Sequence, residues 1–89
     1  MRIAEYRGSL SQKKRDAAHS FMAKVNEQVS IPGRPHVVAG PEGQVVVFCT
    51  FARTGATARS VRHIMSTASQ EILDSHGVWV VGVPDKKHK

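Results

Sequence analysis

The chain has 89 residues, of which 40% are hydrophobic, and 13 Lys and Arg against 7 Asp and Glu give a formal charge of +6. This length suits one domain, no run approaches the roughly 20 apolar residues of a membrane span, and a single cysteine, Cys49, excludes an internal disulfide. We therefore expect one α+β domain at residues 1–84 and a basic disordered tail at 85–89, in the reducing cytoplasm.

The first third of the chain predicts a short strand followed by a helix. Residues 2–6 form the strand, and Ser9 and Gln12 have the spacing of a capping box, in which two side chains satisfy free backbone amides at a helix start. Apolar residues then recur every three or four positions through residues 10–29, which places one stripe on a single helix face. The sequence IPGRP at 31–35 ends this helix.

A β-hairpin is predicted at residues 36–51, HVVAGPEGQVVVFCTF, with its turn at 40–43. The second strand places Val45, Val47, Cys49 and Phe51 on one face and Gln44, Val46, Phe48 and Thr50 on the other. Because both faces are largely apolar, this strand is expected in the interior of the sheet.

A second helix and a last strand follow the hairpin. Helical spacing returns at residues 54–76, with Gly77 placed to cap the helix end. The apolar run VWVVGV at 78–83 predicts a strand that Pro84 closes. The apolar positions of this helix are Ala58, Val61, Met65, Ala68 and Ile72.

These elements predict a two-layer α+β sandwich. The sheet has three or four strands, antiparallel or mixed, and both helices cover one face. The order βαββαβ fits a ferredoxin-like fold, built from split βαβ units, in about this length.

The residue types of catalytic and metal sites do not occur here in useful patterns. The histidines lie far apart, the carboxylates are scattered, and the glycines form no phosphate-binding loop. Cys49 lies in an apolar strand, which favours a buried, unreactive thiol. We therefore expect a non-enzymatic protein with no catalytic residue, metal or cofactor.

The order of charge along both predicted helices opposes the helix dipole. Cations gather at each start, and Glu27, Glu71 and Asp74 lie toward the ends, at a cost of about 0.3–1 kcal/mol for each charge in a terminal turn. A stable core could simply tolerate such a charged surface. Alternatively, both helices start at one edge of the sheet and their cations form a single patch that binds a polyanion, nucleic acid above all. The residues of this predicted patch are Lys13, Lys14, Arg15, Arg53, Arg59, Arg62 and His63.

Two more specific nucleic-acid interpretations are open. The sequence GATARSVRHIM at 55–65 resembles the turn and recognition helix of helix-turn-helix repressors, which implies a regulator whose helix at 57–65 enters the major groove of DNA. The first helix of that motif would fall on residues 44–53, whose β-branched residues favour a strand. An RNA-binding sheet would use Tyr6 and Phe48 for stacking, although valines stand where its aromatic signature belongs. In the helix-turn-helix interpretation the groove-facing residues are Thr57, Arg59, Ser60, Arg62 and His63.

A protein partner is the alternative to nucleic acid. The second face of the predicted sheet carries Val38, Val46, Phe48 and Tyr6, and is too apolar to face water entirely. We expect Tyr6, Val46 and Phe48 to form an interface, either with a second copy of the chain or with an acidic surface of a larger protein machine. In that case the chain is a small inhibitor or adaptor, of the kind that mobile elements encode.

Overall fold

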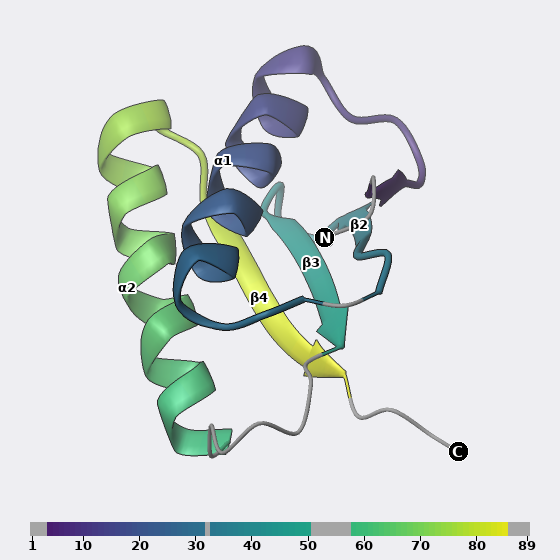
Figure 1. Ribbon diagram of the computed structural model, residues 1–89. Coiled ribbons are helices and arrows are strands. Elements are labelled where there is room, and N and C mark those ends of the chain that lie inside the picture. The colour runs from purple at the N-terminus through teal and green to yellow at the C-terminus, as the bar shows by residue number, and fades with distance from the viewer. Residues whose placement is uncertain (1–3, 32, 51–57, 86–89) are drawn as a thin grey trace.

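The computed structural model describes residues 4–31, 33–50 and 58–85. Within them the predicted element order βαββαβ is confirmed (Figure 1). The elements are β1 (Glu5–Tyr6), α1 (Gln12–Gln28), β2 (His36–Ala39), β3 (Val45–Thr50), α2 (Ala58–His76) and β4 (Val80–Asp85).

The four strands form one mixed sheet in the spatial order β1-β2-β3-β4. Strand β1 pairs with β2 in parallel, β2 with β3 antiparallel, and β3 with β4 in parallel. The α+β class, the mixed sheet and the interior position of β3 are thus confirmed. The ferredoxin-like arrangement is not confirmed, because a split βαβ unit has another strand between its two parallel strands, whereas here each helix connects strands that lie side by side.

The two helices run antiparallel to each other. The β2–β3 hairpin reverses the chain, so the second strand-helix-strand unit runs opposite to the first (Figure 1). Lys13, at the start of α1, consequently lies beside Gly77, just after the end of α2: its Nζ is 3.9 Å from where a Cβ on that glycine would stand. Further along, Lys24 Nζ forms an ion pair with Glu71 Oε1 at 3.3 Å.

The first helix begins later than the capping-box pattern predicts. Ser11 is the N-cap, with extended backbone angles, and its Oγ accepts a hydrogen bond from the Lys14 N–H at 3.3 Å. Gln12 is the first helical residue, and its amide donates forward to Asp16 Oδ1 at 2.8 Å. The predicted box of Ser9 and Gln12 is therefore wrong. The later start leaves Leu10 buried in the core ahead of the helix.

A single apolar core lies between the sheet and the helices. In β3, Val45, Val47 and Cys49 are fully buried, while Val46, Phe48 and Thr50 are only half-buried, which confirms the predicted alternation. The apolar stripe predicted for each helix is buried where the structure describes it. Its buried residues are Ala17, Ala18, Phe21, Met22 and Val25 in α1, and Val61, Met65, Ala68 and Ile72 in α2.

Turn chemistry agrees with the predicted hairpin and helix end. The Gly40 N–H donates to the Gln44 carbonyl at 2.7 Å, and Gly43 adopts a φ of 87°, which favours glycine. At the end of α2, the Gly77 N–H donates to the Leu73 carbonyl at 2.9 Å with a φ of 69°. The predicted hairpin turn and the predicted glycine cap of the second helix are therefore confirmed.

The last strand extends past the residue predicted to end it. Pro84 lies within β4, opposite Cys49 of β3. In a strand, successive backbone N–H groups point to alternate sides, and an edge strand tolerates proline where the missing N–H would face away from its neighbour. The prediction that Pro84 closes the strand is wrong for this reason.

Candidate functional site

The predicted basic patch does not form as one surface. Lys13, Lys14 and Arg15 lie in the first turn of α1, whereas Arg62 and His63 lie near the start of α2. Because the helices are antiparallel, these two groups lie at opposite ends of the helix pair (Figure 1). The prediction of one patch is wrong because it assumed that both helices start at the same edge of the sheet, whereas the β2–β3 hairpin reverses the direction of α2. Arg59 belongs to the first turn of α2, and Arg53 lies outside the described residues.

The structure also gives local roles to two cations of α1. Lys13 lies beside the C-terminal end of α2, where the helix dipole favours positive charge. The Arg15 guanidinium lies over the Tyr6 ring, 5.3 Å from its centroid, a cation–π contact. The positive charges of Lys13 and Arg15 oppose the dipole of α1, but they interact favourably with the end of α2 and with the Tyr6 ring. This geometry accounts for part of the reversed charge order without a bound anion.

The side of the sheet away from the helices carries an apolar surface, which we call the open face. It consists of the half-buried residues Val38, Val46, Phe48, Val81 and Val83. The strand register places them in two adjacent rows, because Val46 is paired with Val38 and Val81, and Phe48 is paired with Val83. The neighbour of Phe48 in β2 is His36, whose Nδ1 lies 3.3 Å from Glu5 Oε1. The open face is therefore a contiguous strip of valine and phenylalanine with a polar rim.

Tyr6 does not share the open face with Val46 and Phe48. It is paired with the buried Val37, packs against the core and lies under Arg15 of α1. Partial burial raises the pKa of its hydroxyl, although Arg15 opposes that shift. Of the three residues predicted for the interface, the structure brings Val46 and Phe48 together, as direct neighbours two positions apart on one face of β3, and leaves Tyr6 on the other side.

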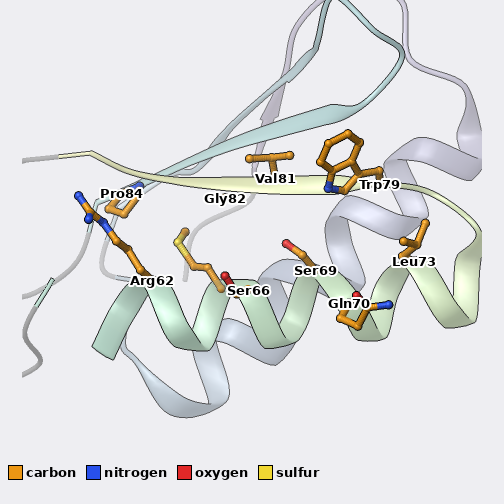
Figure 2. Close-up of a pocket in the computed structure, with 10 residues that line it drawn as sticks. Arg62, Ser66, Ser69, Gln70, Leu73, Trp79, Val81, Gly82 and Pro84 are labelled. Atoms are coloured by element: carbon orange, nitrogen blue, oxygen red, sulfur yellow. The ribbon is translucent and has the colours of Figure 1, made fainter. Parts of the chain in front are cut away.

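A groove runs along the free edge of the sheet between β4 and α2, with a volume of about 580 Å³ (Figure 2). We call it the edge groove. On α2 it is lined by Arg62, Met65, Ser66, Ser69, Gln70 and Leu73, and on β4 by Trp79, Val81, Gly82 and Pro84. Arg62 and Pro84 lie at one end, and Leu73 and Trp79 at the other.

Sequence reasoning missed two residues of the edge groove. Trp79 is 54% exposed and Leu73 is 41% exposed. Among the described residues, these two are the exposed large hydrophobic side chains. The period of two in VWVVGV placed Trp79 on the same face as Val81, away from the buried Val78 and Val80. Leu73 follows the core residue Ile72 and so falls off the buried stripe of α2. Both signals were present in the sequence.

Cys49 is a core residue without catalytic character. Its side chain is fully buried in β3, and burial raises the pKa of the thiol to about 12 from the ordinary value of 9.0. The folded chain therefore holds the thiol proton more tightly than the unfolded chain. The resulting stabilisation is complete below pH 9 and is lost as the pH rises from 9 to about 12.

We expect Cys49 to resist iodoacetamide in the folded chain at neutral pH and to react once denaturant unfolds it. Between pH 9 and about 12, the free energy of unfolding should fall more steeply in the native chain than in Cys49→Ala, which lacks the titrating group. Denaturant titrations at several pH values measure both slopes. Equal slopes, or rapid labelling of the folded chain, would contradict the assignment.

The structure also bears on the helix-turn-helix and metal-site hypotheses. Residues 45–50 form strand β3, so the first helix that a helix-turn-helix motif requires is absent from this position, and the resemblance ends at the second helix. Among the described residues, no three His, Cys, Asp or Glu side chains gather in a way that would hold a metal ion. None of the described helices is both long and apolar enough to cross a membrane.

Comparison with protein-family models, curated proteins and solved structures found no match.

Proposed function

We propose that this chain is a non-enzymatic binding protein that docks on an acidic partner protein through its open face. The observation that supports the proposal is the apolar character of both sides of β3. An antiparallel or mixed sheet with one face in water ordinarily alternates apolar and polar residues. Here valine and phenylalanine occupy outward positions on three neighbouring strands, and burying such a surface contributes about 25 cal/mol per Å² of apolar area.

The charge of the chain supports an acidic partner. The formal charge is +6, and the salt bridges among the described residues use Arg7, Lys24 and His36. The cations at the start of α1 and Arg62 of α2 therefore keep their charge unneutralised within that part of the chain. Long-range attraction between this positive surface and a negative partner accelerates association and weakens as salt is added.

Nucleic acid is the second candidate, and the exposed Lys13 and Arg15 with the adjacent Lys14 favour it. Three cations in one helical turn beside free backbone amides attract phosphate. With the two basic groups at opposite ends of the helix pair, each would act alone. Binding of that kind would be independent of sequence and steeply dependent on salt.

A capture experiment with nuclease treatment separates the two candidates. Immobilised native chain is incubated with lysate, treated with nuclease and washed at two salt concentrations, and the retained proteins are compared with those on a Phe48→Glu variant. We expect nuclease-resistant capture by the native chain and its loss in Phe48→Glu, because a carboxylate on the open face repels an acidic partner and must be desolvated on docking. Val46→Thr, which keeps the β-branched shape, tests the same face with less risk to the fold.

The matched control is Ala23→Glu, which adds the same charge at an exposed position of α1, away from the open face. It should capture the partner as the native chain does. Circular dichroism melting shows whether each variant is folded. Loss of the partner after nuclease treatment would support nucleic acid instead, and undiminished capture by folded Phe48→Glu and Val46→Thr would exclude the open face.

A further inference from the structure

The outer edge of β4 presents backbone groups that no strand of the described sheet pairs. The Trp79 carbonyl accepts from the Val45 N–H at 2.9 Å, so the backbone polar groups of Trp79 point toward β3. Because the direction of the backbone N–H and C=O groups alternates along a strand, these groups of Val80 and Gly82 point away from β3. The Ser69 hydroxyl agrees with this direction, since it donates to the Val80 carbonyl from the α2 side at 2.6 Å. The outward N–H and C=O of Gly82 are left facing the edge groove.

The edge groove has the form of a slot for an extended chain. Its walls are an edge strand and a helix that runs beside it, and its lining combines apolar side chains with serine hydroxyls (Figure 2). Peptides that add a strand to a sheet edge use this combination: backbone hydrogen bonds supply affinity, and pockets for alternate side chains supply specificity. Pro84 removes one backbone donor, which confines pairing to the stretch around Gly82.

The charge of the groove selects among such peptides. Arg62 is an exposed cation at one end of the groove, and the described lining residues include no carboxylate. Arg62 takes no part in the salt bridges of the described residues. A guanidinium beside an open strand edge matches a carboxylate, which it binds through two parallel hydrogen bonds.

We propose that the edge groove binds an extended acidic segment of a protein, which adds as a further strand beside β4. The segment's backbone hydrogen-bonds with Gly82, its alternate side chains pack against Leu73 and Trp79, and a carboxylate pairs with Arg62. This site shares Val81 with the open face, but the groups that bind the segment, Gly82, Arg62, Leu73 and Trp79, lie outside the open face, so the proposal stands whether or not Phe48 contacts a partner.

A labelled peptide of alternating glutamate and valine or threonine, capped at both ends, tests the proposal, with a peptide that carries lysine at the glutamate positions for comparison. Fluorescence anisotropy with the full chain should show saturable binding of the acidic peptide and at least about tenfold weaker binding of the basic one. Arg62→Glu should weaken binding of the acidic peptide by a similar factor. Arg34→Glu makes the same change of charge at an exposed site outside the groove and should not.

Amide exchange gives the geometric readout. The outward Gly82 N–H should exchange quickly in the free chain and slowly with the acidic peptide bound, while the Val81 N–H, which points toward β3, should be unchanged. Equal affinity for both peptides, an unaffected Arg62→Glu variant, or no added protection at Gly82 would overturn the proposal. So would a concentration-dependent dimer in sedimentation that excludes the peptide, because the groove would then belong to a second copy of the chain.

Discussion

Replacement of Phe21 by alanine is expected to lower the free energy of unfolding by about 3–5 kcal/mol. Phe21 is fully buried in α1, where it faces both the sheet and α2, and its ring reaches the position of Gly82 in β4. Truncation removes the apolar contacts of a whole ring and leaves a cavity that α1, α2 and β4 cannot close together. A domain of 89 residues is stable by about 4–13 kcal/mol, so this variant should be marginally folded.

Urea denaturation followed by circular dichroism measures the loss in Phe21→Ala. The matched control is Leu73→Ala, which truncates a large apolar side chain that is already 41% exposed in α2 and should change stability by less than about 1 kcal/mol. Comparable losses in the two variants would mean that Phe21 does not lie at the centre of the core.

Replacement of Gly82 by valine is expected to destabilise the fold by about 1–3 kcal/mol or more through overpacking. A Cβ at this position would stand 2.6 Å from Met65 Cε and 2.7 Å from Phe21 Cζ, closer than nonbonded atoms approach. The glycine is the point at which α1, α2 and β4 meet. The two branches of valine would force both side chains out of their packed positions.

The control for Gly82 is Gly33→Ala, since a Cβ there meets no atom within 4 Å and its backbone angle is an ordinary one. This variant should be neutral or slightly more stable, because alanine restricts the unfolded chain. A double variant adds a sharper test: Gly82→Ala combined with Met65→Ala should cost less than the two single changes together, because the shorter side chain makes room for the new methyl group. Strict additivity would contradict the contact between these residues.

The sequence pattern predicted every element of the described fold but not the way the strands are ordered. Helical spacing and the alternation in β3 are local properties, and each follows from which side chains avoid water. Strand order depends on contacts between distant segments, and the pattern is equally compatible with a split or an unsplit strand-helix-strand unit. The errors at Ser9 and Pro84 concern the bounds of elements: Ser11 instead of Ser9 caps α1, and β4 continues through Pro84 because an edge strand tolerates a proline nitrogen that faces away from its neighbour.

The candidate site was predicted only in part, for a physical reason. Val46 and Phe48 could be assigned to one face from their spacing alone, and the structure places them there. The grouping of Lys13 with Arg62 required knowledge of helix direction, which the β2–β3 hairpin reverses. The edge groove could not be foreseen, because it exists only once β4 is known to be an edge strand with α2 beside it.

The most direct test of the proposed function uses the valine methyl groups of the chain as paired reporters. Methyl NMR spectra are recorded with and without the nuclease-resistant partner. The account predicts shifts at the outward residues Val38, Val46, Val81 and Val83 and none at the inward residues Val37, Val45, Val47 and Val80, which lie in the core. A bound partner that leaves the methyl signals of all four outward valines unshifted would contradict it.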